Sequence, residues 1–259
     1  MINYNYYIAK ILARRCMADI RINDVPLMLQ SVDGEVTTEP HVNYLIEQTG
    51  LQTLTVRIVP PIGALSFPAG AACEVEIWRC DGSGTKIQPL ETVCTSVLKI
   101  GENDTAIPFK FDKKVFTAEV PFKILRWSAC EKFGDDKALG GRIASFFRRF
   151  GDILATRQTD EYMKLVGERE HNLCAALYLG NEEIEMRNRM LFNCLSRGFE
   201  LQPMAGKKKL QYYADRRLVT VLDADMKSSL RFINRETGEI LAVHLLLGIK
   251  KGQKELSII

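Results

Sequence analysis

A strong excess of either charge is missing from this sequence. Its 259 residues include 35 Lys and Arg against 32 Asp and Glu, which gives a net charge of +3. No overall field therefore draws the chain toward nucleic acid or an anionic membrane, and only local patches could do so. We expect neither nucleic acid nor membrane among its partners.

Long apolar runs are also missing. No stretch approaches the roughly 18 apolar residues of a membrane-spanning helix. The first residues, MINYNYYIAKILARRC, differ from a secretory signal because Lys10 and Arg14 interrupt the apolar residues. We expect a cytoplasmic protein whose N-terminal segment forms a first strand.

Cysteine pairs at metal-binding or redox spacing are absent. The seven cysteines include no C-x-x-C, and most lie within apolar strand or helix patterns. An odd number in such positions favours buried free thiols and a reducing compartment over disulfides. The residues concerned are Cys16, Cys73, Cys80, Cys94, Cys130, Cys174 and Cys194.

The common catalytic and nucleotide-binding motifs are missing too. There is no G-x-S-x-G and no G-x-G-x-x-G, and Gly82-Ser83-Gly84 is more typical of a hairpin turn than of a nucleophile elbow. We therefore assign no catalytic residue and no cofactor. Catalysis by a cysteine and a histidine stays open, because those residues need be neighbours only in space.

What the first half does contain is a series of short alternating segments separated by turn signals. One alternating segment ends at the turn pair Asn23-Asp24, and another is stopped by Pro60-Pro61. Roughly eight strands in residues 1–127 predict an all-β sandwich, since two packed sheets commonly bury alternating faces. The expected strands include 18–22, 25–29, 51–59, 73–78, 107–112 and 115–127.

The second half changes to a helical period. A stripe from Ile143 to Leu154 predicts one helix, residues 159–178 a second, and a third begins with Asn181 as N-cap. Strands are expected afterwards at 210–213, 218–222, 230–233, 240–247 and 256–259. Helices followed by an antiparallel meander predict an α+β domain over residues 142–259. The glycine-rich, charged segment 128–141 is the expected linker.

Glu168 and His171 have the (i, i+3) spacing that di-metal helical bundles use. Such a site needs a second Glu-x-x-His, but His41 and His244 follow Thr38 and Leu241 at that spacing. The helical stripe also places Glu168 nearly opposite the core. We therefore expect no bound metal.

Glu170 is the less ordinary carboxylate, because it falls within the apolar stripe of the same helix. One interpretation is a residue at the edge of the stripe that pairs with an arginine such as Arg142 or Arg187. The other is a polar group inside a ligand pocket.

Two further side chains are candidates for ligand binding. His244 falls in an expected strand that is apolar on both faces, where it would be a hydrogen-bonded core residue or, alternatively, a general base. Trp78 is the one evident aromatic candidate for a carbohydrate platform on the sandwich. Glu170, His244 and Trp78 are thus the candidate ligand-binding residues.

Two resemblances can be attached to these segments. The runs Ile20 to Leu27 (IRINDVPL), His41 to Gly50 and Leu51 to Ile58 (LQTLTVRI) resemble galactose-binding-like jelly-roll sandwiches, although Gln52 stands where that pattern has asparagine. The resemblance implies architecture and transfers no sugar-binding residue. The helix-then-meander half resembles cystatin-like or NTF2-like folds, in which a curved sheet wraps a helix and encloses a cavity in some members.

The stretches Gly167 to His171 (GEREH), Phe199 to Pro203 (FELQP), Tyr213 to Val219 and Glu255 to Ile259 are similar to bacterial proteins of toxin–immunity and secretion loci. The absence of catalytic signatures beside two well-patterned domains favours a non-catalytic protein-binding function, and this similarity makes immunity against a delivered toxin its most concrete version. An NTF2-like enzyme or ligand binder with Glu170 or His244 in its cavity is the alternative. A carbohydrate-binding module using Trp78 is the third.

Overall fold

The computed structural model describes residues 4–82, 87–101, 104, 106–204 and 206–259. The predicted turn at Gly82-Ser83-Gly84 falls mostly outside these residues. The density of contacts divides the chain into two compact units, Met1–Leu125 and Arg126–Ile259. We describe each unit by itself. Within the described residues, no helix combines the length and the apolar character needed to cross a membrane.

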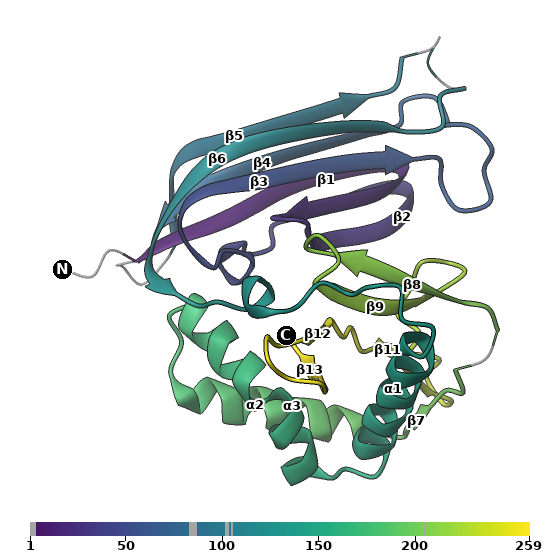
Figure 1. The fold of residues 1–259 in the computed structure, drawn as a ribbon. Helices are drawn as coiled ribbons and strands as arrows, with labels where there is room; N and C mark the ends of the chain where they lie inside the picture. The colour runs from purple at the N-terminus through teal and green to yellow at the C-terminus, as the bar shows by residue number, and fades with distance from the viewer. Residues whose placement is uncertain (1–3, 83–86, 102–103, 105, 205) are drawn as a thin grey trace. The chain divides into compact units, whose positions relative to one another are not determined.

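The first unit is a single antiparallel sheet of six strands. Its order is β5-β4-β1-β3-β6, with β2 paired to β1 (Figure 1). The strands are β1 (Asn5–Ile22), β2 (Val25–Thr38), β3 (Gln48–Val59), β4 (Ala72–Asp81), β5 (Gln88–Lys99) and β6 (Lys110–Lys123). The predicted strands 107–112 and 115–127 correspond to one strand, β6, which runs only from Lys110 to Lys123.

Local sequence explains the joint between β1 and β2. Asn23 and Asp24 have φ angles of 54° and 60°, as the two-residue turn of a hairpin requires. The Asn23 side chain fixes this turn, because its Nδ2 donates to the Leu45 carbonyl and its Oδ1 accepts from the Thr53 amide. The predicted turn is thus confirmed.

The N-terminal segment and residues 18–22 form one strand with a bulge. The register of β1 on β2 shifts between Arg14 and Cys16, where Arg15 has a φ of 47°. The extra residue changes which positions point inward, so that Ala13 and Cys16 are both completely buried. One long strand therefore keeps an apolar inner face from Tyr7 to Ile22.

The sheet curls, so that its two end strands β5 and β6 lie side by side (Figure 1). The Ser96 hydroxyl on β5 donates to the Asp112 carboxylate on β6 at 2.9 Å. Inside the curl, the Glu119 amide donates to the Tyr7 hydroxyl, whose ring lies 6.3 Å from that of Phe116. The inner face of one curled sheet thus forms this core.

The second unit begins with three helices, α1 (Leu139–Ala155), α2 (Thr159–Ala176) and α3 (Asn181–Leu195). These match the predicted helices, and Gly198 after α3 has the φ of +87° that suits a helix end. The predicted N-cap is wrong, because Gly180 occupies that position and Asn181 is already helical. Glu182 and Glu183 do lie in the first turn, where the helix dipole favours them.

Two small antiparallel sheets follow the helices. Their orders are β11-β10-β7 and β13-β12-β9-β8. The predicted strand 240–247 is broken into two short strands, with residues 243–246 between them in neither sheet. The strands are β7 (Phe199–Leu201), β8 (Lys208–Tyr213), β9 (Leu218–Asp223), β10 (Arg231–Asn234), β11 (Ile240–Ala242), β12 (Leu247–Ile249) and β13 (Leu256–Ile258).

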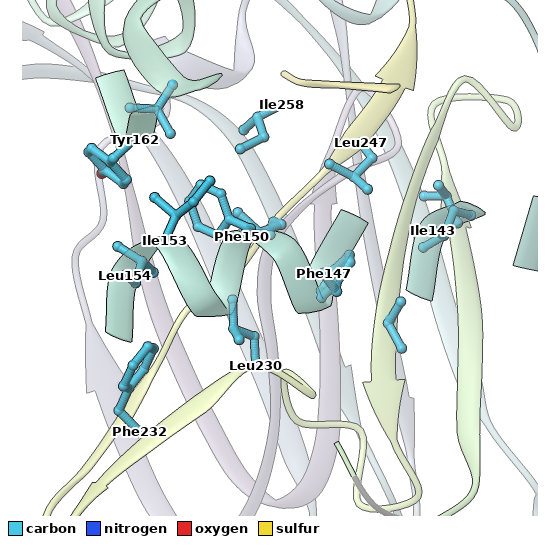
Figure 2. Packing of buried hydrophobic residues seen from close by; sticks show 14 of the residues in the cluster. Ile143, Phe147, Phe150, Ile153, Leu154, Tyr162, Leu230, Phe232, Leu247 and Ile258 are labelled. Atoms are coloured by element: carbon cyan, nitrogen blue, oxygen red, sulfur yellow. The ribbon is translucent and has the colours of Figure 1, made fainter. Parts of the chain in front are cut away.

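The core of this unit forms where α1 meets the strands. The predicted stripe of α1 is buried, and Figure 2 shows it against side chains of the strand region. The labelled α1 residues are Ile143, Phe147, Phe150, Ile153 and Leu154, and the facing residues include Leu230, Phe232, Leu247 and Ile258. Burying aromatic and aliphatic side chains of this size contributes about 1.5–3 kcal/mol each.

The segment predicted as a linker, residues 128–141, belongs to the second unit in this structure. The Glu131 amide donates to the Ile249 carbonyl, and the Phe133 amide donates to the Arg216 carbonyl. Phe133 and Leu139 are also part of the buried core. The boundary between the two units lies after Leu125.

Candidate functional site

Glu168 and His171 are engaged separately. Glu168 forms an ion pair with Lys250, and His171 places its Nδ1 2.6 Å from the Gly167 carbonyl oxygen. Because a carbonyl only accepts, Nδ1 is the donor in this contact. Across the described part of the chain, no group of three or more His, Cys, Asp and Glu side chains could hold a metal ion.

Glu170 is the buried carboxylate of the helical unit. Only 2% of its side chain is exposed, and it lies between two guanidinium groups. Arg169 of the same helix donates to Oε1 through two nitrogens, and Arg187 of α3 donates to Oε2 at 3.0 Å. The predicted pairing with an arginine is correct for Arg187, whereas the sequence did not indicate Arg169.

The pKa of Glu170 follows from this environment. Burial alone would raise it, but the two guanidinium groups outweigh burial and hold the pKa below its ordinary value of 4.5. The carboxylate is therefore ionised at neutral pH and joins α2 to α3. A permanently charged, fully paired group suits a structural joint better than proton transfer.

His244 was predicted to lie in a strand. It lies instead in the segment between β11 and β12, and its side chain is exposed. The prediction failed because the chain leaves the sheet after Ala242, so the alternation of a strand no longer applies. In the described structure His244 and Glu170 share no hydrogen bond.

Trp78 faces outward from β4 and is half-buried. The Lys10 ammonium lies 5.1 Å from its ring centroid, and its Nε1 donates to Glu76 at 2.9 Å. A carbohydrate platform needs an open aromatic face. Here a lysine of the same unit already covers that face.

A shallow hollow of about 560 Å³ lies where α1 ends and α2 begins. It is lined by Ser145, Arg148, Arg149, Asp152, Ile153, Gln158 and Glu161. Neither Glu170 nor His244 is among these residues. The hollow is open to solvent and carries both charge signs, so it offers no enclosed cavity for the ligand-binding alternative.

The most unusual surface of the first unit consists of two pairs of exposed apolar side chains, one on the outer face of β3 and β6 and one at the start of β6. We call Leu51, Phe109, Phe111 and Val115 the β3–β6 strip. Their exposed fractions are 76%, 44%, 60% and 59%. Single exposed apolar residues are ordinary on protein surfaces, but neighbouring ones mark interaction sites.

The strand register brings Leu51 and Val115 together, and a ring contact joins the other two residues. Thr53 pairs with Val115, Leu51 pairs with Thr117, and β3 lies beside β6 in Figure 1. The rings of Phe109 and Phe111 lie 6.1 Å apart. Paired residues of an antiparallel sheet point to the same face, so Leu51 and Val115 are diagonal neighbours.

Sequence reasoning missed this strip. Phe116, Ala118 and Val120 of β6 are buried, whereas Phe111 and Val115 are exposed, so the apolar residues of this strand occupy both faces. The available signal was that Phe111 and Val115 occupy strand positions whose side chains point to solvent. It was lost because residues 107–127 were assigned to two strands with no common register.

Known proteins offer no further guidance to the site. No protein-family model, no curated protein and no solved structure matches this chain.

Proposed function

We propose that this protein is non-catalytic and binds another protein through the β3–β6 strip. The observation that carries the proposal is the exposure of two neighbouring pairs of large apolar side chains along β3 and β6, Leu51 with Val115 and Phe109 with Phe111. Transferring such a surface from water into an interface is favourable, and a buried aromatic anchor commonly dominates the affinity.

The most specific form of the proposal is immunity against a delivered bacterial toxin. It extends the expectation that residues 167–171, 199–203, 213–219 and 255–259 raised through their resemblance to bacterial proteins associated with such loci. All seven cysteines are free, which is consistent with a reducing, cytoplasmic compartment. The jelly-roll and cystatin-like or NTF2-like assignments remain part of this proposal, supported by the curled sheet and by α1 packing on strands.

Two matched variants test the proposal. A photo-crosslinking amino acid at position 111 first identifies the bound protein in the source cells. The purified partner is then titrated against Phe111→Ser and against Leu65→Ser, which changes an even more exposed apolar residue in the loop between β3 and β4.

We expect Phe111→Ser to weaken binding by about 2 kcal/mol, roughly thirtyfold, because it removes an aromatic anchor. Leu65→Ser should bind as the wild type does. Both variants should keep the wild-type melting temperature, since exposed substitutions usually change stability by less than about 0.5 kcal/mol. Equal binding by both variants and the wild type would refute the proposal.

A stabilisation screen with small molecules addresses the ligand-binding alternative. A compound that raises the melting temperature of the wild type, with the effect lost in Glu170→Gln or His244→Gln, would favour that alternative.

A further inference from the structure

Two cations point outward beside the β3–β6 strip. In the register of β3 and β6, Arg57 pairs with Phe111 and Thr55 pairs with Lys113. Arg57 and Lys113 therefore share the face of the strip, and both are exposed. The Arg57 guanidinium lies 5.2 Å from the ring centroid of Phe109.

Neither cation has a counter-charge in the described structure. The carboxylate in register with Arg57 is Asp19 on β1, but Arg21 holds both of its oxygens, at 2.8 and 2.6 Å. Asp112 pairs with Lys114, and both side chains point to the opposite face of β6 from Lys113. No ion pair of the described residues includes Arg57 or Lys113.

The stacked position of Arg57 affects what it can bind. An arginine that lies over a ring keeps the in-plane edge of its guanidinium available, and this edge matches a carboxylate with two parallel hydrogen bonds. Stacking also limits the rotamers of the side chain, so less entropy is lost when an anion binds.

Charge and shape together select among possible occupants. A second copy of this chain would bring Arg57 and Lys113 near their own equivalents, which like-charge repulsion opposes. Single-stranded nucleic acid would use stacking aromatics, but Arg57 already lies over the Phe109 ring, and Leu51 and Val115 offer no ring face to a base. A protein surface with both apolar and acidic side chains complements all of these residues.

We infer that the partner bound at the β3–β6 strip presents Asp or Glu side chains around an apolar anchor, with Arg57 and Lys113 as the residues that select them. This inference rests on the proposed function and adds the chemistry of the partner. The apolar residues supply affinity, while the two cations supply orientation and discrimination against basic or neutral competitors.

The test uses a random peptide library displayed on phage and selected on the full-length protein. We expect peptides that retain binding to the wild type but lose it on Phe111→Ser, and that carry Asp or Glu next to Phe, Leu or Trp. Selection on the double variant Arg57→Glu, Lys113→Glu should instead enrich Lys and Arg at those positions.

A synthetic peptide from the wild-type selection provides the quantitative step. Its affinity should fall at least about tenfold in Lys113→Glu and should weaken with added salt. The control is Lys123→Glu, which reverses the same charge near the far end of β6 and should change the affinity by less than about twofold.

The outcomes separate the two claims. Peptides that depend on Phe111 but are neutral or basic would overturn the inference and leave the proposed function intact. A selection without any Phe111-dependent peptide would count against both. Two other results would also overturn the inference. One is binding of oligothymidine that depends on Phe111, measured by fluorescence anisotropy. The other is a concentration-dependent dimer that is lost in Phe111→Ser.

Discussion

The joint between α2 and α3 and the β3–β6 strip use arginine in opposite ways. At the joint, Arg169 and Arg187 surround the buried Glu170, so the carboxylate is paired within the unit. At the strip, Arg57 stands beside exposed phenylalanines and pairs with no carboxylate of the described chain. Paired charges hold the fold together there, and unpaired charges beside apolar surface are free to meet a partner.

The largest effect on stability is expected at the joint. Glu170→Ala leaves two guanidinium groups facing each other without their common counter-ion, which should destabilise the protein by about 1–3 kcal/mol. Both arginines can turn partly toward water, so the full cost of a buried unpaired charge does not apply. Urea denaturation measures the change, and partner binding should remain at the wild-type level.

Glu170→Gln is the conservative control, because its amide still accepts a hydrogen bond from one arginine. It should lose less stability than Glu170→Ala. A stability of Glu170→Ala equal to that of the wild type would show that the ion pairs do not stabilise the fold.

Acid should reduce the contribution of the same residue. The folded state holds the pKa of Glu170 below its ordinary value of 4.5, so the stabilisation is complete at higher pH and is lost as the pH falls through the folded pKa. The stability difference between the wild type and Glu170→Gln should therefore be constant above about pH 6 and shrink in acid. A difference that grows in acid would mean that the carboxyl group is stabilised in its protonated form.

A smaller, kinetic difference is expected between cysteines of the two units. Burial raises the pKa of Cys16 to about 11 and that of Cys73 to about 12, whereas Cys194 on α3 is only partly buried. Because the thiolate is the reactive form, Cys194 should react first with a thiol reagent at pH 8, and the cysteines of the curled sheet should react only on unfolding. Denatured protein should titrate seven thiols, and three or fewer would indicate disulfides.

The sequence indicated most elements of the fold because their local signals agree. Helix α1 has an apolar stripe that the core buries, and Asn23-Asp24 has the turn chemistry that a hairpin needs. The curl of the sheet could not be predicted, since it depends on pairing between distant strands and on the bulge at Arg15. Local periodicity carries no information about which strands become neighbours.

The candidate residues show the same limit. Glu170 was singled out by its place in a helical stripe, and its partner Arg187 was among those expected. Arg169 was missed because adjacent residues on a helix do not normally face each other, yet its long side chain reaches the carboxylate. Arg57 and Phe109 lie far apart in the sequence, and only the register of β3 on β6 brings them together.

Hydrogen exchange of the protein with and without its crosslinked partner tests the central claim most directly. We predict slower exchange in the complex for the amides of residues 51–57 and 109–117, with α2 and α3 unchanged, because the partner covers the β3–β6 strip and not the joint at Glu170. Slower exchange confined to α2 and α3, with the strip exchanging as it does in the free protein, would contradict it.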